Sequence, residues 1–170
     1  RNGNSWSRPI NMGQTINSKH WESQPSFASD GKTLYFVRGR YNKEHERFDD
    51  IYFSELINGK WAKAQALPPN INSTEDEESV FIHPDNKTLY FSSRGHVGLG
   101  NMDIFMSRKN DDGTWSDPVN LGYPINTPEH ENSFFVSADG EYAIIASNRE
   151  GGYGKLDLYS FELPEALKPN

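Results

Sequence analysis

The chain repeats one pattern three times. Three tryptophans recur 55 and 54 residues apart, at Trp6, Trp61 and Trp115. The triplets Asp-Ile-Tyr, Asp-Ile-Phe and Asp-Leu-Tyr follow nearly the same period and begin at Asp50, Asp103 and Asp157. A fixed period of this length is typical of repeat proteins, in which each unit buries its apolar face only against its neighbours. The sequence therefore predicts a row of similar stacked units.

Each unit is predicted to be a small antiparallel sheet. The second copy shows the pattern most clearly, with apolar or β-branched runs at 79–83, 88–93, 102–107 and 115–121. Short runs at this spacing, broken by turn residues, indicate a four-stranded meander. Pro118 places the fourth strand at an outer edge, because proline cannot donate to a ladder. Four-stranded units of this length are the blades of a β-propeller, so the predicted fold class is all-β.

The other copies follow the same scheme. Strands are expected at 23–27, 33–37, 51–54 and 61–67 in the first copy, and at 133–137, 142–146 and 156–161 in the third. The predicted organisation is an outer strand in residues 1–17, three blades at 18–74, 75–128 and 129–163, and an exit linker at 164–170. The outer strand either closes the last blade or completes a preceding one. Closed propellers typically have 4 to 8 blades. We therefore expect half of a six-bladed ring, completed by a second chain or by further blades.

Bulk properties exclude several classes of partner. The net charge is −7, and no run of Lys or Arg exceeds two residues, so we expect no nucleic-acid binding. We also expect no membrane span, because no apolar run approaches 18 residues. The chain contains no cysteine, which rules out disulfides and thiolate metal sites.

Several segments resemble a known propeller repeat. The strings Asp-Gly-Lys-Thr-Leu-Tyr-Phe at 30–36 and Asp-Asn-Lys-Thr-Leu-Tyr-Phe-Ser-Ser-Arg-Gly-His at 85–96 resemble the WD40-like (PD40), TolB-type repeat. Residues 115–128 and 147–159 are similar to the propellers of Bacteroidetes OmpA-family envelope proteins, some of which serve type IX secretion and gliding. The resemblance implies a periplasmic, outer-membrane-associated protein with protein partners in the cell envelope. Peptidoglycan would be bound only by a separate domain outside this chain.

Three sets of recurring residues are expected to build the scaffold. Asp50, Asp103 and Asp157 are expected to accept backbone N–H bonds from the preceding loops. Arg38, Arg94 and Arg149 end the second strands and are expected to pair with acidic residues between blades. Trp6, Trp61 and Trp115 are expected to pack between blades, although stacking on a carbohydrate is the functional alternative.

Acidic and histidine residues gather where each innermost strand begins. The rim candidates are His20, Glu22, Asp76, Glu78, His130 and Glu131. In a propeller these residues would converge near the central channel, where carboxylate and imidazole groups could hold a divalent metal or a basic partner. The alternative, which we favour, is a solvated acidic rim. We accordingly expect neither a metal nor a cofactor.

One loop breaks the repeat and is the preferred contact site. The segment from Gly39 to Asp49 is longer than its counterparts and carries Tyr41, His45 and Phe48. Binding specificity is commonly placed on such loops. With no Ser/His/Asp nucleophile pattern, the leading hypothesis is a non-catalytic interaction module. A glycan-binding propeller and a metal-dependent oligosaccharide lyase of the TolB-like class are the alternatives.

Overall fold

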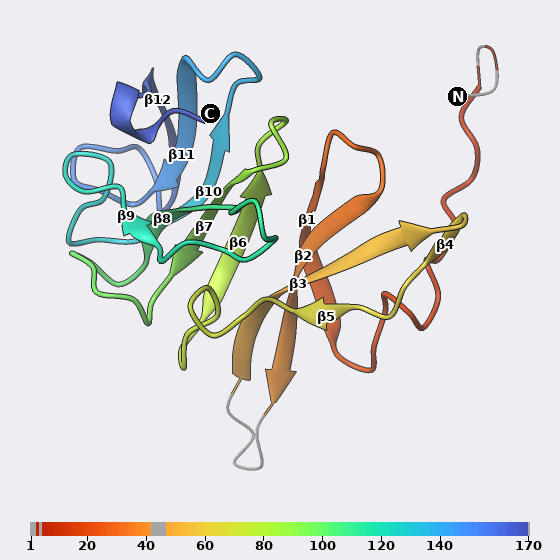
Figure 1. Ribbon diagram of the computed structural model, residues 1–170. Coiled ribbons are helices and arrows are strands. Elements are labelled where there is room, and N and C mark those ends of the chain that lie inside the picture. Colours follow the sequence, from red (N-terminus) through yellow and green to blue (C-terminus); the bar gives the residue numbers. More distant parts are fainter. Residues whose placement is uncertain (1–2, 4, 42–46, 170) are drawn as a thin grey trace.

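The chain forms a fan of three antiparallel sheets (Figure 1). The computed structural model describes residues 3, 5–41 and 47–169. Within these ranges there are twelve strands and one short 3₁₀ helix, Glu165–Leu167. The prediction of an all-β propeller with antiparallel blades is confirmed, and the sheets do not close into a ring.

The three sheets correspond to the three sequence repeats, and we number them blades 1 to 3. Blade 1 consists of β1 (Trp21–Phe27), β2 (Thr33–Tyr41), β3 (Arg47–Ile57), β4 (Lys60–Trp61) and β5 (Gln65–Ala66). Blade 2 consists of β6 (Glu77–Ile82), β7 (Thr88–Ser93), β8 (Asp103–Arg108) and β9 (Val119–Asn120). Blade 3 consists of β10 (Glu131–Val136), β11 (Tyr142–Ser147) and β12 (Asp157–Glu162).

The fourth strands are shorter than expected. Run 61–67 becomes the fragments β4 and β5, which both pair with β3, and run 115–121 retains only β9 beside β8. Pro118 immediately precedes β9 and has no N–H to donate, so the ladder cannot continue through it. The outer strand of blades 1 and 2 is therefore a short edge strand, and blade 3 has three strands among the described residues.

Aspartate turns set the hairpin between the first two strands of each blade. Asp85 accepts N–H bonds from Lys87 at 2.8 Å and from Thr88 at 2.9 Å. Burial alone would raise the pKa of Asp85, but these bonds and the Thr88 hydroxyl outweigh it and hold the pKa below its usual value. Asn86 follows with φ 59°, a left-handed conformation that asparagine tolerates well. Asp30 makes the equivalent bonds in blade 1.

The blades pack face to face. One buried cluster joins blades 1 and 2 and includes Tyr35, Ile51, Leu89 and Phe91. A second cluster joins blades 2 and 3. The first strands β1, β6 and β10 lie side by side: Ser26 Oγ of β1 accepts from Ile82 N–H of β6 at 3.0 Å, and Ser79 Oγ of β6 accepts from Ser133 N–H of β10 at 3.2 Å.

Buried asparagines tie each connector to the third strand of the blade before it. The Asn126 side chain accepts from Ile104 N–H at 2.8 Å and donates to Ile104 C=O at 2.9 Å. Asn72 holds Ile51 in the same way, at 2.8 and 3.0 Å. These two asparagines are one repeat apart, and we call them connector clamps.

Residues 15–16 and the C-terminal tail are tied to the blades. Near the N-terminus, Thr15 C=O accepts from Ala64 N–H at 2.9 Å, and Ile16 is buried in a cluster with Phe36. At the other end, the expected exit linker turns back onto blade 2. The Tyr90 hydroxyl donates to Leu167 C=O at 2.6 Å, and Arg108 donates to Lys168 C=O at 2.7 Å.

Candidate interaction site at the inner rim

The segment that breaks the repeat forms an extended hairpin. Strands β2 and β3 are 9 and 11 residues long, whereas the four equivalent strands of blades 2 and 3 have 6 each. Strand β1 pairs with β2 only as far as Gly39, and β2 continues to Tyr41 with β3 as its sole partner among the described residues. The hairpin therefore projects past its own blade (Figure 1).

The predicted contact residues lie on this hairpin. Tyr41 is 57% exposed and Phe48 is partly buried. The third predicted residue, His45, lies outside the described residues. At the base of the hairpin, the indole of Trp21 packs against Gly39. A Cβ atom at residue 39 would overlap this indole. A glycine at this position therefore lets β1 support the base of the hairpin.

Charged residues join the hairpin to blade 2. Asp50 forms an ion pair with Arg40, and burial raises the pKa of Asp50 above its ordinary value although Arg40 opposes the shift. Asp76 Oδ1 accepts from Asp49 N–H at 3.1 Å. Arg94 Nη1 lies 3.3 Å from the other oxygen of Asp76.

The same rim continues to blade 3. Glu78 lies 3.8 Å from Arg94 Nη2 and 3.6 Å from His130 Nε2, and it accepts from Asn132 Nδ2 at 3.0 Å. The structure thus brings three rim candidates together: Asp76, Glu78 and His130. Together with the hairpin base they form the surface that we call the inner rim. Acidic side chains outnumber basic ones there, which suits a basic or polar partner.

The remaining rim candidates lie apart from this set. Glu22 accepts from the Ser18 hydroxyl at 2.7 Å and from Arg38 Nε at 2.8 Å. Glu131 is fully buried and accepts from Thr127 N–H at 2.9 Å and from the Thr127 and Ser147 hydroxyls at 2.7 and 2.8 Å. Both carboxylates are therefore occupied by hydrogen bonds within the scaffold, and Glu131 is buried instead of belonging to the solvated acidic rim that was expected. His20 lies just before β1, which contains Glu22, and its backbone N–H donates to Ser18 Oγ at 3.0 Å.

Sequence reasoning missed a repeated structural motif here. Glu22, Glu77 and Glu131 each accept hydrogen bonds from a serine or threonine four residues earlier. The detectable signal is an Asn-Ser or Asn-Thr pair before each glutamate, beginning at Asn17, Asn72 and Asn126. Among the described residues, no group of three or more His, Asp or Glu side chains is arranged to hold a metal ion.

Glu77 should make stability depend on pH. Burial raises the pKa of Glu77 from 4.5 to about 7, against the lowering effect of the hydroxyls of Ser73 and Ser93. Between pH 4.5 and about 7, the Glu77 carboxyl group is protonated in the folded chain and ionised in the unfolded chain. The stability that Glu77 contributes is therefore fully present below about pH 4.5 and is lost as pH rises through 7, by about 3 kcal/mol in total.

We expect Glu77→Gln to flatten that part of the profile. The measurement is urea unfolding at half-unit steps from pH 4.5 to 8. Glu129→Gln, at an exposed rim position, is the matched control and should keep the wild-type slope. An unchanged slope in Glu77→Gln would contradict the assignment.

The recurrent aspartates have different hydrogen-bond partners in the three blades. Asp103 Oδ2 accepts from the Leu99 backbone N–H and from Asn120 Nδ2 at 3.2 Å. Asp157 Oδ2 accepts from Tyr153 and Gly154 N–H at 2.6 and 3.0 Å. Asp50 instead pairs with Arg40, because its blade replaces the glycine-rich loop by the extended hairpin.

The arginines hold their own connectors rather than the recurrent aspartates. Arg149 Nη2 donates to Ile125 C=O at 2.6 Å and lies 3.5 Å from Glu131, and Arg38 does the same with Ile16 C=O and Glu22. Arg94 pairs with Asp76 and Glu78 instead. The expected carboxylate partners were in neighbouring blades, whereas these lie on the first strand of the same blade or, for Asp76, directly before it.

The three repeated tryptophans differ in how far they are buried. Trp115 is 8% exposed and meets Tyr35 edge-on across blades 1 and 2, with ring centroids 6.2 Å apart. Trp61 packs partly buried beside Phe27 at 6.0 Å. Trp6 departs from the expectation of packing between blades, because it is 83% exposed.

Solved structures show the class of fold. TolB from Acinetobacter baumannii superposes with a TM-score of 0.58 at 17% identity, covering 89% of this chain and 32% of that protein. A putative TolB from Agrobacterium tumefaciens gives 0.57 at 16% identity, covering 89% and 48%. A puromycin-hydrolyzing peptidase from Mycobacterium tuberculosis gives 0.59 at 14% identity, covering 89% and 23%. The chain therefore has a TolB-like β-propeller fold.

Sequence comparison adds a distant relative. No family model matches the chain. It is 24% identical over 139 residues to an uncharacterized protein from two strains of Staphylococcus epidermidis. The matched region is 78% of this chain and 39% of the relative, so the chain spans about two fifths of the curated relatives it matches. Among the described residues, no helix is long and apolar enough to cross a membrane.

Proposed function

We propose that this chain is a non-catalytic interaction propeller that presents the β2–β3 hairpin and the inner rim to a protein partner. The observation that carries the proposal is the extension of β2 and β3 beyond the repeat, with Tyr41 57% exposed on the projecting part. A rigid scaffold that holds one irregular loop is a common arrangement for binding sites. The ion pair between Arg40 and Asp50 supports the base of that hairpin.

The cellular setting is proposed from sequence resemblance. Residues 115–128 and 147–159 resemble the propellers of OmpA-family envelope proteins, which supports a periplasmic, outer-membrane-associated location and a role beside type IX secretion components. The acidic inner rim favours a partner that carries basic or hydrogen-bonding groups. Peptidoglycan would then be bound by a separate domain.

Site-specific photocrosslinking tests this proposal. A photoreactive amino acid replaces Tyr41 in the full-length protein, which is expressed in its native host and irradiated there. We expect a covalent adduct with one defined envelope protein, identified by mass spectrometry after cell fractionation. Phe48→Ala in the same protein should lower the adduct yield at least threefold.

A matched position supplies the control. Asp111 has a fully exposed side chain in the turn after β8, at the other end of blade 2, so the same photoreactive group there should give no such adduct. Equal labelling from both positions would overturn the hairpin assignment. Metal-dependent cleavage of an oligosaccharide by the purified protein would instead establish the lyase alternative, and saturable binding of peptidoglycan fragments would establish the glycan-binding one.

A further inference from the structure

Each blade holds one backbone carbonyl of the connector that precedes it. The three carbonyls belong to Ile16, Ile71 and Ile125, which are one repeat apart. In blade 1, Arg38 Nη2 donates to Ile16 C=O at 2.6 Å. In blade 3, Arg149 Nη2 donates to Ile125 C=O at 2.6 Å. In these two blades an arginine therefore ties the connector to the sheet.

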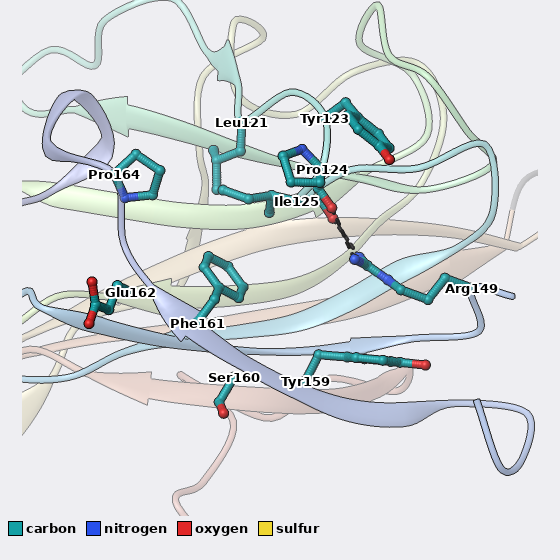
Figure 2. Close-up of a pocket in the computed structure, with 10 residues that line it drawn as sticks. All are labelled: Leu121, Tyr123, Pro124, Ile125, Arg149, Tyr159, Ser160, Phe161, Glu162 and Pro164. Carbon is teal, nitrogen blue, oxygen red and sulfur yellow. Dashed lines mark hydrogen bonds between the residues drawn. The ribbon is translucent and has the colours of Figure 1, made fainter. Parts of the chain in front are cut away.

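Both arginines also lie on an aromatic ring of the third strand. The guanidinium carbon of Arg149 is 5.0 Å from the centre of the Tyr159 ring, and Figure 2 shows the side chain between that ring and the connector. Arg38 lies 4.3 Å from the centre of the Tyr52 ring in the same way. A cation over an aromatic face is attracted by the ring quadrupole. Each arginine thus bridges a connector and a third strand.

In blade 2 this structural role belongs to His96. Its Nε2 lies 2.9 Å from Ile71 C=O, and it is the donor because a carbonyl oxygen only accepts. The His96 ring packs on Phe105, with centroids 5.2 Å apart. Phe105 occupies the repeat position of Tyr52 and Tyr159. The connector of blade 2 is therefore held without an arginine.

Arg94 is left outside the scaffold as a result. Its side chain is 48% exposed and lies 3.3 Å from Asp76 and 3.8 Å from Glu78. None of its guanidinium N–H groups makes a hydrogen bond to a described residue, whereas those of Arg149 hold two connector carbonyls. Half-exposed ion pairs of this length contribute little to stability. Arg94 thus presents hydrogen-bond donors at the inner rim.

The backbone at residue 94 does not require an arginine. Arg94 N–H donates to Asp76 C=O at 3.0 Å, and one repeat later Asn148 N–H donates to His130 C=O at 3.4 Å. The two positions therefore share the same backbone hydrogen bond while their side chains differ. Asn148 uses its side chain to accept from His130 N–H at 2.9 Å. The side chain at residue 94 is thus free for another use.

The surroundings of Arg94 define what it can bind. A carboxylate of a partner would be repelled by Asp76 and Glu78 beside it. The acceptor that fits is a neutral backbone carbonyl, which is the group that Arg38 and Arg149 already hold. An extended segment offers such carbonyls, because a helix uses its carbonyls internally. The two carboxylates in turn suit lysine or arginine side chains of that segment.

We propose that Arg94 binds backbone carbonyl groups of an extended, basic segment of the protein partner, while Asp76 and Glu78 bind the basic side chains of that segment. This inference rests on the interaction role proposed above for the inner rim. All three residues belong to blade 2, because Arg94 follows β7 and the two acidic residues lie at the start of β6. Arg94 is thus the residue through which the rim recognises the backbone of the partner.

Titration of the purified chain with two synthetic peptides tests the proposal. One peptide alternates lysine with threonine, and the other alternates glutamate with threonine. Threonine is used because it favours an extended backbone. By isothermal titration calorimetry, we expect the lysine peptide to bind at least tenfold more tightly than the glutamate peptide.

Arg94→Ala gives the decisive comparison. Removing a positive charge would, by Coulomb attraction alone, strengthen the binding of the lysine peptide. The proposal requires the opposite, at least fivefold weaker binding, because the donors to the peptide carbonyls are lost. Glu78→Gln should weaken binding at least threefold. Lys87→Ala is the matched control, because Lys87 is 56% exposed and pairs with Asp111 at the other end of blade 2, and it should change the affinity less than twofold.

Thermal unfolding separates a binding role from a scaffold role. Arg94→Ala should shift Tm by less than about 1 °C, whereas His96→Ala should lower it by about 5 °C because the connector loses its donor. Equal losses of Tm in the two variants would overturn the proposal. Unchanged or tighter binding of the lysine peptide by Arg94→Ala would do the same, as would a wild-type chain that binds neither peptide or both equally. The crosslink from residue 41 uses no peptide. A captured partner together with a failed titration would therefore remove the role of Arg94 and leave the proposed function standing.

Discussion

Asn126→Ala is expected to lower the free energy of unfolding by about 3 kcal/mol, or roughly 10 °C in Tm. The Asn126 side chain makes three hydrogen bonds, to both backbone groups of Ile104 and to Asn120 Oδ1 at 2.8 Å, and it is fully buried. Alanine would leave the Ile104 N–H buried and unpaired. Because this clamp joins the connector of blade 3 to blade 2, we expect blade 3 to loosen first.

Two measurements together check this prediction. Urea unfolding gives the size of the loss, and amide hydrogen exchange of β10 to β12 gives its location. Asn101→Ala, at an exposed position, is the matched control and should shift stability by less than about 0.5 kcal/mol. If Asn126→Ala matched that control, the clamp would be structurally unimportant.

Phe91→Ala is expected to be the most damaging of the substitutions considered, with a loss of about 4 kcal/mol. Phe91 is fully buried in the cluster between blades 1 and 2, where its ring stacks on Phe105 with centroids 5.9 Å apart. Truncation removes this packing and leaves a cavity at the junction of the two blades. Thermal unfolding followed by near-UV circular dichroism should report the change.

Phe91→Leu is the graded control. Leucine keeps most of the apolar volume, so we expect less than half of the alanine effect. A similar loss for both variants would mean that the site tolerates no repacking at all. A loss below 1 kcal/mol for alanine would contradict the placement of Phe91 at the centre of the junction.

Local signals made most of the fold predictable. The strand β7 agrees with the expected run at 88–93, because its turn is set by Asp85 and Asn86 within a few residues in sequence. The period fixed the equivalence of the blades. These inferences needed only the turn residues of short hairpins and the alternation of apolar residues. Both features involve residues that are close together in the sequence, so a single sequence is enough to detect them.

The site was harder to predict because it depends on where carboxylates point. Glu78 and Glu131 both sit where a first strand begins, and both were assigned to one rim. In the structure Glu78 faces His130 at the rim, whereas Glu131 turns inward to Thr127. Glu131 is equivalent to Glu77, which accepts from Ser73 in the same way, whereas Glu78 is the next residue along β6. Because successive residues of a strand point to opposite faces, a difference of one position decides whether a glutamate faces the rim or the interior.

Trp6 shows the limit of inference by repeat. Its sequence context matches that of Trp115, yet one ring is exposed and the other is buried. The difference arises because burial of a repeat residue requires the neighbouring unit as well as its own. The repeat period identifies equivalent positions, but the burial of each side chain depends on the blades that surround it.

The anchored C-terminal tail has a mechanical consequence. A pull on the end of the chain reaches Leu167 and Lys168 first, where Tyr90 and Arg108 hold their carbonyl groups. The force is then shared between blades 2 and 3, instead of unzipping β12 from β11 one hydrogen bond at a time. The stacked sheets should therefore resist tension at this end as a unit. The β2–β3 hairpin would then keep its position while the chain is under load.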